Sequence, residues 1–383
     1  MKRFKRLAAL FLAIFTAAAL FGCQGAKNGQ TDGTDDSASS ETESTEEKEL
    51  VYPEKTDGMF TMKALEDWAK FNGRYYFAGK TGMTFDWSSS GFSVNVETED
   101  TDFTVFIRTG YDLYVSVYVD GAEAARPLVK KEDASFSVPL TKGTHTVTIY
   151  KDTEVNTSGS ADLLGIDFEG TLLPPPENKK LYIEFYGASY ETGQGALGTF
   201  VQGEAWSLPD HSATHSHCHY LAQKLDADYS IVAKGGIGAV KDSGGYNLPD
   251  LFPYVVGYRE QLTKYSFERK PDLVIIQLGG NDGSTDLIGY GNACENFLTN
   301  VRAQYGKEVP ILWLGRNQGR QDAVKKAANK LGDTNFYYLT YEVKGLGSAA
   351  LKTQTKGHPN AEEQENIANT VEKFIRENKL LEK

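Results

Sequence analysis

The sequence predicts a chain of two folded parts, an antiparallel β domain over residues 56–173 and a doubly wound α/β domain over residues 178–383. Short strands with alternating apolar side chains and no helical period occupy residues 58–170. From residue 181 onward, apolar strands alternate with helical stretches, which is typical of a parallel sheet covered by helices on both faces. Between the two patterns lies Leu173-Pro-Pro-Pro176, which predicts a stiff linker because consecutive prolines stay extended.

The first 23 residues have the pattern of a targeting segment. Four basic residues within positions 1–6 precede an apolar run over 7–21. Leu20-Phe21-Gly22-Cys23 resembles a bacterial lipoprotein lipobox, which implies a lipidated Cys23 at the mature N-terminus. We therefore expect a signal peptide over 1–23 and a protein anchored to the extracytoplasmic face of a bacterial cell membrane. The alternative is an ordinary secretory signal in which the cysteine occurs by chance.

A polar segment follows the targeting segment. Residues 24–50 are mostly Gly, Ser, Thr, Asp and Glu, so they cannot bury enough apolar surface to offset their chain entropy. We expect a disordered acidic tether over 24–55, which contributes much of the formal charge of −12. With 52 acidic and 40 basic residues, the chain is a poor partner for nucleic acid, whose phosphates require a basic face.

The β domain is predicted from segments in which apolar and polar side chains alternate. Asp120-Gly121 and Lys142-Gly143 are turn signals beside these segments. An antiparallel sandwich or jelly roll follows from many such strands without helices. The predicted strands are 92–96, 103–107, 113–119, 136–138 and 145–150.

The α/β domain is predicted from five strand–helix alternations, which give a parallel sheet. The predicted strands are 182–186, 230–233, 273–278, 311–314 and 336–339. The predicted helices are 217–225, 254–265, 293–304, 321–331 and 361–378.

Four loops of this sheet carry the residues that acyl transfer needs. Ser189 follows the first strand, Gly238 the second and Asn281 the third, and His358 precedes the last helix. These loops share the edge where open α/β sheets bind their ligands. Ser189 offers a nucleophile and His358 a base that works near neutral pH. The backbone N–H groups of Ser189 and Gly238 and the Asn281 amide can stabilise the oxyanion.

Each of these residues also has a purely structural interpretation. Ser189 can cap a helix. Gly238 can permit a tight turn, as can the rival glycines at 235–236. Asn281 can form an Asx turn, and His358 can lie on the surface at a helix entry. The order Ser, Gly, Asn, His at successive sheet-edge loops favours the catalytic interpretation.

This constellation resembles the SGNH or GDSL hydrolase superfamily, whose fold is flavodoxin-like. The motifs that carry the resemblance are Gly187-Ala-Ser189, with Ala188 where Asp is usual, then Gly238, Gly280-Asn-Asp282 and His358-Pro359. In the β domain, three segments look like the accessory domain of carbohydrate esterase family 2: Gly143-Thr-His-Thr-Val147, Lys151-Asp-Thr-Glu154 and Leu172-Leu-Pro-Pro175. The resemblance runs from about residue 59 to residue 378.

The resemblance implies a jelly roll followed by an SGNH hydrolase domain that removes O-acetyl groups from carbohydrates, without a cofactor. The superfamily usually has Asp three residues before the histidine, where this chain has Thr355. Family 2 therefore implies a Ser189–His358 dyad, in which a backbone carbonyl can support the imidazole. Two alternatives stay open: a catalytically inactive carbohydrate-binding lipoprotein, and a lipase or thioesterase of the same superfamily.

Histidines and a cysteine gather before and within the first predicted helix: His211, His215, His217, Cys218 and His219. His215 and His219 are spaced for one helix face, but no carboxylate stands at ligand spacing. We predict no metal here and favour substrate contact or a plain helix N-terminus. After lipidation only Cys218 and Cys294 remain, and they can either pair or stay as buried thiols.

Overall fold

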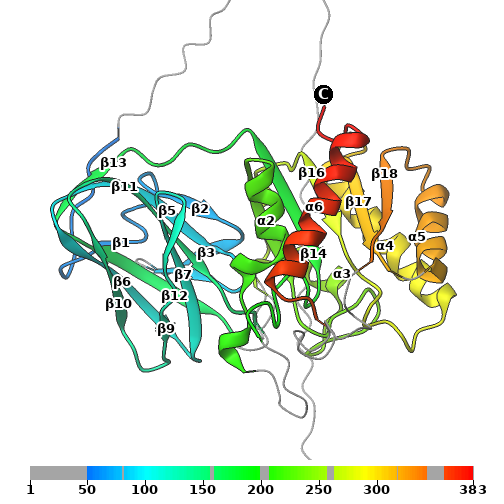
Figure 1. Cartoon of the computed structure of the whole chain (residues 1–383), viewed down its shortest axis with the longest axis horizontal. Coiled ribbons are helices and arrows are strands. Elements are labelled where there is room, and N and C mark those ends of the chain that lie inside the picture. The colour runs from blue at the N-terminus through cyan, green and yellow to red at the C-terminus, as the bar shows by residue number, and fades with distance from the viewer. Residues whose placement is uncertain are drawn as a thin grey trace, which may run out of the picture. The chain divides into compact units, whose positions relative to one another are not determined.

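The computed structural model describes residues 50–79, 82–155, 159–198, 207–256, 263–316, 318–342 and 358–382. Two antiparallel sheets come first in the chain and a parallel sheet follows (Figure 1). The predicted fold class, a jelly-roll-like β domain before a doubly wound α/β domain, is confirmed. The predicted signal peptide, Cys23 and the tether up to residue 49 lie outside the described residues. No helix in the described part is long and apolar enough to span a bilayer.

The two sheets of the β domain pack face to face around one apolar core. One has the order β10-β6-β12-β4-β3, with β1 beside β12. Its strands are β1 (Phe60–Thr61), β3 (Tyr75–Ala78), β4 (Gly82–Phe85), β6 (Thr101–Thr109), β10 (Ser135–Leu140) and β12 (Ala161–Asp167). The other has the order β13-β5-β11-β7-β8, with β2 beside β5 and β9 beside β7. Its strands are β2 (Lys70–Asn72), β5 (Gly91–Thr98), β7 (Leu113–Val119), β8 (Ala122–Ala125), β9 (Leu128–Val129), β11 (Gly143–Lys151) and β13 (Gly170–Leu173).

Period-two alternation explains these sheets. Val94 and Val96 of β5 are fully buried, as are Phe103 and Val105 of β6 in the facing sheet. The Asp120-Gly121 signal forms the predicted hairpin turn between β7 and β8, with positive φ angles of 53° and 83°.

The parallel sheet has the order β15-β14-β16-β17-β18. Numbered along the domain this is 2-1-3-4-5, the flavodoxin-like order. The strands are β14 (Leu181–Gly187), β15 (Ala227–Ala233), β16 (Leu273–Ile276), β17 (Ile311–Gly315) and β18 (Phe336–Thr340). All neighbouring pairs are parallel.

Helices cover both faces of this sheet. One core contains side chains of α2 (His217–Lys224) and α6 (Ala361–Glu377), and the other contains side chains of α3 (Leu248–Leu251), α4 (Leu287–Tyr305) and α5 (Gln318–Lys330). Two 3-10 turns, η1 (Leu208–Asp210) and η2 (Ala213–His215), precede α2. Cys218 lies in the first core and Cys294 in the second, and both are free buried thiols. They do not pair because the sheet separates them.

The prediction of a helix over 254–265 is wrong. Tyr254 pairs with Lys264 in an antiparallel bridge. The cause lies in the β domain, because the buried Arg74 donates from Nη1 to the Tyr254 carbonyl oxygen at 3.1 Å. A helix would use that carbonyl within itself. Residues 257–262 lie outside the described part.

Arg74 also reaches Glu184, the one acidic residue of β14. Both side chains are fully buried, with Arg74 Nη2 3.9 Å from Glu184 Oε2. The carboxylate accepts hydrogen bonds from the hydroxyls of Tyr182, Tyr186 and Tyr305. A buried charge requires such partners, so this cluster fixes the β domain against the parallel sheet.

Part of the predicted tether contacts the β domain. The Trp68 indole donates to the Val51 carbonyl oxygen at 3.0 Å, and the Leu172 N–H donates to the Tyr52 hydroxyl at 3.0 Å. Tyr52 also packs edge-on against Trp68. Residues 51 and 52 are therefore attached to the folded part, because they are the apolar end of an otherwise polar segment.

Candidate active site

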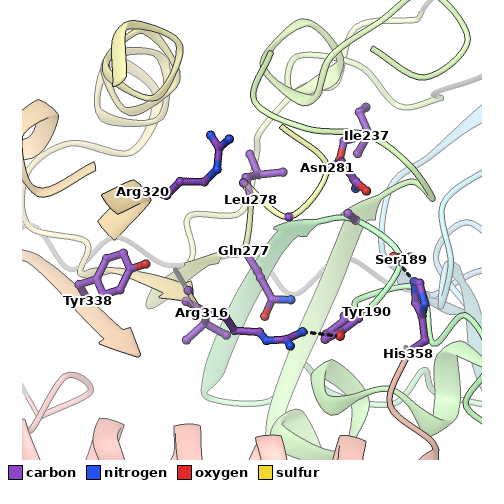
Figure 2. A pocket seen from close by; sticks show the side chains of 15 residues that line it. Ser189, Tyr190, Ile237, Gln277, Leu278, Asn281, Arg316, Arg320, Tyr338 and His358 are labelled. Atoms are coloured by element: carbon purple, nitrogen blue, oxygen red, sulfur yellow. Dashed lines mark hydrogen bonds between the residues drawn. The ribbon is translucent and has the colours of Figure 1, made fainter. Parts of the chain in front are cut away.

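Ser189 and His358 meet at the carboxyl edge of the parallel sheet. Ser189 follows β14 and is 8% exposed, and His358 precedes α6. The distance from His358 Nε2 to Ser189 Oγ is 2.7 Å (Figure 2). This is hydrogen-bond distance, the geometry in which an imidazole can take a proton from a serine hydroxyl.

A buried carboxylate holds the turn that carries Ser189. Glu191 Oε2 accepts the Ala188 N–H at 2.8 Å. A Cβ at Gly187 would overlap the Glu191 carboxyl group, so the turn requires glycine there. The Ser189 N–H has no hydrogen-bond acceptor among the described residues, and it is therefore free to bind an oxyanion.

His358 is placed by the start of α6 and by an aromatic neighbour. The Asn360 side chain caps the helix by accepting the Glu363 N–H at 3.0 Å. The Ala361 N–H donates to the Ala196 carbonyl oxygen at 2.8 Å, which attaches the helix start to the loop after Ser189. The ring of Tyr190 packs edge-to-face against the imidazole, with centroids 5.3 Å apart.

The structure does not bring the Gly238 N–H into the site. That group donates to the Lys241 carbonyl oxygen at 2.9 Å, and Gly238 is not among the residues that line the cavity at Ser189. Position 238 requires glycine for another reason, since a Cβ there would lie 2.6 Å from the Asp282 carboxyl carbon. The sequence pattern therefore correctly predicted that position 238 requires glycine. The reason is contact with Asp282, not a role of the Gly238 N–H in the oxyanion hole.

Gly236, one of the two alternative glycines in this loop, is exposed and does not line the cavity at Ser189 either. In this loop the Gly235 N–H donates to Glu154 and the Ile237 N–H to the Lys234 carbonyl oxygen. Within the described residues the Gly236 N–H has no acceptor. Its φ of +77° is a conformation that glycine adopts readily.

Asn281 lines the cavity as predicted. Its Nδ2 donates one hydrogen to the Ile237 carbonyl oxygen at 2.7 Å. That bond fixes the orientation of the amide and leaves the second N–H hydrogen for a ligand. The next residue, Asp282, is fully buried and accepts the N–H groups of Ala239, Val240 and Lys241 at 2.8–3.0 Å. The side chains of Asn281 and Asp282 therefore connect the second and third loops, while the Asp282 carbonyl oxygen accepts the Thr285 N–H within its own loop at 2.9 Å.

A carboxylate of the β domain also supports the site. Glu154 is 2% exposed, and its Oε2 accepts the Gly235 N–H at 2.8 Å and the Thr192 hydroxyl at 3.4 Å. Thr192 belongs to the Ser189 loop and Gly235 to the loop after β15. One buried carboxylate from outside the parallel sheet thus connects two loops of the site.

The cavity beside Ser189 has a volume of about 260 Å³. Arg316 lies on its wall and donates to the Tyr190 hydroxyl at 2.6 Å (Figure 2). The lining residues are Ala188, Ser189, Tyr190, Ile237, Gln277, Leu278, Gly279, Gly280, Asn281, Leu314, Gly315, Arg316, Arg320, Tyr338 and His358. Such a cavity accommodates a small acyl group and the adjoining part of an alcohol.

The histidine cluster does not line this cavity. The prediction that His215 and His219 share a helix face is wrong, because α2 begins at His217 after Ser216, which caps it. His215 Nδ1 lies 2.8 Å from the Ser212 hydroxyl, and His219 Nδ1 lies 2.7 Å from the Tyr229 hydroxyl. No group of three or more metal-ligating side chains occurs in the described part of the chain.

Sequence reasoning missed the carboxylates that hold the loops. Glu154 belongs to the Lys151-Asp-Thr-Glu154 segment, which served only to show the family resemblance. Glu191 lies two residues after the nucleophile and had no role assigned from the sequence. Their position in the sequence was a usable signal. Each lies within a segment that the fold buries, and a buried carboxylate requires a hydrogen-bond partner. Their partners are backbone N–H groups of distant loops, which the local sequence pattern does not specify.

Comparison with known proteins gives one family match and one curated relative. Residues 71–176 match the family model described as "Carbohydrate esterase 2 N-terminal". An acetylxylan esterase / glucomannan deacetylase of Cellvibrio japonicus is 34% identical over 157 residues, which are 39% of this chain and 42% of the relative. The alignment thus covers less than half of that relative's length.

Solved structures share the arrangement of both domains. A family two carbohydrate esterase from Clostridium thermocellum, in complex with cellohexaose, has a TM-score of 0.71 at 24% identity, covering 81% of this chain and 98% of that chain. One from Cellvibrio japonicus has a TM-score of 0.71 at 21% identity, covering 82% and 95%. Residues 71–176 thus match the carbohydrate esterase 2 N-terminal model, and the chain has the two-domain fold of these solved structures.

Proposed function

We propose that this protein is a serine esterase that removes O-acetyl groups from carbohydrates. The observation that carries the proposal is the 2.7 Å distance between Ser189 Oγ and His358 Nε2, beside a small cavity at the edge of the sheet. The family match and the relative named acetylxylan esterase / glucomannan deacetylase support an acetylated polysaccharide as substrate. The neighbour bound to cellohexaose supports a carbohydrate-binding site on this fold.

In the proposed reaction, His358 Nε2 takes the Ser189 proton as Oγ attacks the acetyl carbonyl carbon. The oxyanion is bound by the Ser189 N–H and the Asn281 amide, which both belong to residues lining the cavity. His358 then donates its proton to the departing sugar oxygen, which leaves an acetyl-serine. Water, deprotonated by His358, attacks the acetyl group, and release of acetate restores the Ser189 hydroxyl.

The base works in this proposal as part of a Ser189–His358 dyad. Residues 343–357, directly before His358 in the sequence, contain no Asp or Glu. The orienting acid that the superfamily usually carries is therefore absent from the histidine's own segment. Loss of such an acid lowers the rate but does not remove the proton transfer itself.

The test is hydrolysis of 4-nitrophenyl acetate and of acetylated xylan and glucomannan oligosaccharides. We expect the wild type to release acetate and to be labelled by a fluorophosphonate at Ser189. Ser189→Ala should lose both activities and keep the same unfolding midpoint. Activity of Ser189→Ala close to that of the wild type would refute the mechanism. Oligosaccharide binding without turnover or labelling in the wild type would favour the non-catalytic alternative.

We further propose that the protein is a lipoprotein anchored at the cell surface through Cys23. The basic and apolar pattern of residues 1–23 and the Leu20-Phe21-Gly22-Cys23 motif support this. Metabolic labelling with a palmitate analogue in a bacterial host should mark the wild type and not Cys23→Ala. Equal labelling of the two would exclude lipidation at this cysteine.

A further inference from the structure

One wall of the candidate active-site cavity is basic. Arg316, directly after β17, and Arg320, in α5, both line it, and none of the lining residues is Asp or Glu. The chain as a whole has a formal charge of −12. The cavity therefore has the opposite sign to the whole molecule, which favours entry of an anion over a cation.

Arg316 and Arg320 differ in how many contacts their guanidinium groups make with the rest of the protein. Arg320 donates to the carbonyl oxygens of Asp282 and Thr285, and its guanidinium lies 4.5 Å from the Tyr290 ring centroid. These contacts give Arg320 a structural role between two loops. Arg316 has no such backbone contacts within the described residues.

Arg316 has an exposed side chain and no ion pair with any described Asp or Glu. Its one hydrogen bond in the described part runs from Nη1 to the Tyr190 hydroxyl, 2.6 Å away. By contrast, Arg126 and Arg302 are paired with Asp152 and Asp333. A guanidinium has five N–H hydrogens, so the contact with Tyr190 leaves most of its donors for a ligand.

The contact with Tyr190 places the guanidinium next to the reaction centre. Tyr190 directly follows Ser189, and its ring packs against His358. Figure 2 shows the Arg316 side chain extending past Gln277 toward Tyr190 and His358. The planar fork of a guanidinium matches the two oxygens of a carboxylate, which a neutral sugar lacks.

We propose that Arg316 binds a carboxylate of the substrate, so that the preferred substrates are carbohydrate esters with a carboxylate close to the ester bond. The proposal rests on the esterase function proposed above. The carboxylate can belong to the sugar, as in an acetylated uronic acid, or to the acyl group, as in a succinyl ester. Arg316 is thus a specificity-determining residue for the class of ester that reacts.

The test compares kcat/KM for two matched pairs of substrates. The first pair is the O-acetyl esters of methyl glucuronoside and methyl glucoside, and the second is the O-succinyl and O-butyryl esters of methyl glucoside. We expect the wild type to prefer the charged member of one pair by on the order of tenfold, and the pair identifies where the carboxylate lies. Increasing salt should reduce this preference because Arg316 is exposed.

Arg316→Gln should bring the ratio of the two kcat/KM values close to one, and Arg316→Lys should retain part of the preference. Lys326→Gln, which removes an exposed cation of α5 that does not line the cavity, should leave the ratio unchanged. An equal loss for both members of each pair in Arg316→Gln would show that Arg316 only positions Tyr190, and would overturn the proposal.

The two proposals fail in different ways. If the wild type hydrolyses the neutral esters and shows no preference in either pair, only the role of Arg316 is refuted. If it hydrolyses none of the four esters and no acetylated oligosaccharide, the esterase function itself is refuted.

Discussion

The two sides of the candidate active site are built differently. On the side of the nucleophile, buried carboxylates of Glu154, Glu191 and Asp282 accept backbone N–H groups from the loops after β14 and β15. On the side of the base, His358 depends on where α6 starts, through the Asn360 cap and the contact with Tyr190. Hydrogen bonds to ionised acceptors are about twice as strong as neutral ones.

The difference teaches which parts of the site have to be rigid. The nucleophile and the oxyanion donors must hold their positions while charge develops, so a fixed backbone benefits the reaction directly. The base has to accept and return a proton, and a single imidazole at a helix start can do so. We therefore expect substitutions of the buried carboxylates that hold the nucleophile's loops to change stability and activity together, and substitutions of the reacting residues Ser189 and His358 to change activity alone.

Removing the base should have the largest effect on activity. His358→Ala should lower kcat for 4-nitrophenyl acetate by roughly 10²–10⁴-fold, because general-base catalysis contributes that much. Its urea midpoint should stay close to that of the wild type. The double variant with Ser189→Ala should be no slower than Ser189→Ala, since the two residues act as a unit. A further loss in the double variant would contradict the dyad.

Asp282→Asn should affect both stability and activity. The two carboxylate oxygens serve three N–H groups, and an amide has a single acceptor oxygen, so at least one N–H loses its partner. We expect the free energy of unfolding to fall by about 1.5–3 kcal/mol, with a decrease in kcat as Asn281 shifts. Urea denaturation and steady-state kinetics measure the two effects. Asp322→Asn, which changes an exposed carboxylate of α5, is the control and should change neither.

A pH-dependent loss of stability is expected from His219, which belongs to neither side of the site. Burial lowers the pKa of His219 to about 4 from an ordinary value of 6.5. Below pH 6.5 the unfolded chain binds a proton that the folded chain does not, so stability is full above pH 6.5 and falls as pH decreases toward 4. The loss amounts to about 3 kcal/mol at pH 4.

His219→Gln should remove this part of the acid sensitivity. The measurement is the free energy of unfolding at pH 7.5 and at pH 5 for both proteins. A wild type and a variant that lose the same stability between these pH values would show that His219 is not the group responsible.

Glu154 should have the smallest effect, and its substitution measures how much the β domain contributes to the site. Glu154→Ala leaves the Gly235 N–H without its acceptor, and we expect kcat to fall about tenfold. KM should change little, because Glu154 does not line the cavity. Glu154→Gln keeps an acceptor oxygen and should recover most of the rate. An unchanged kcat in Glu154→Ala would show that the β domain does not position the catalytic loops.

Sequence reasoning succeeded where the physical signal was local. Alternation over 92–96 and 103–107 predicted β5 and β6, and the residue order Ser189, Asn281, His358 predicted which loops meet. It was wrong for residues 254–265 because Arg74, far away in the chain, takes a carbonyl oxygen that a helix would need. It was wrong for Gly238 because the reason for that glycine is the Asp282 carboxylate, which comes from another loop.

By itself, the sequence determined the two-domain fold class and the loops from which the reacting groups come, because strand and helix periods depend on neighbours a few residues apart. The tertiary structure alone decided which N–H groups are free to bind an oxyanion, since Gly235 and Gly238 are engaged by Glu154 and by Lys241. It also decided that the exposed Arg316 lies on the wall of the cavity at Ser189. Hydrogen-bond partners and charge neighbours depend on packing between distant segments, and no local pattern contains that information.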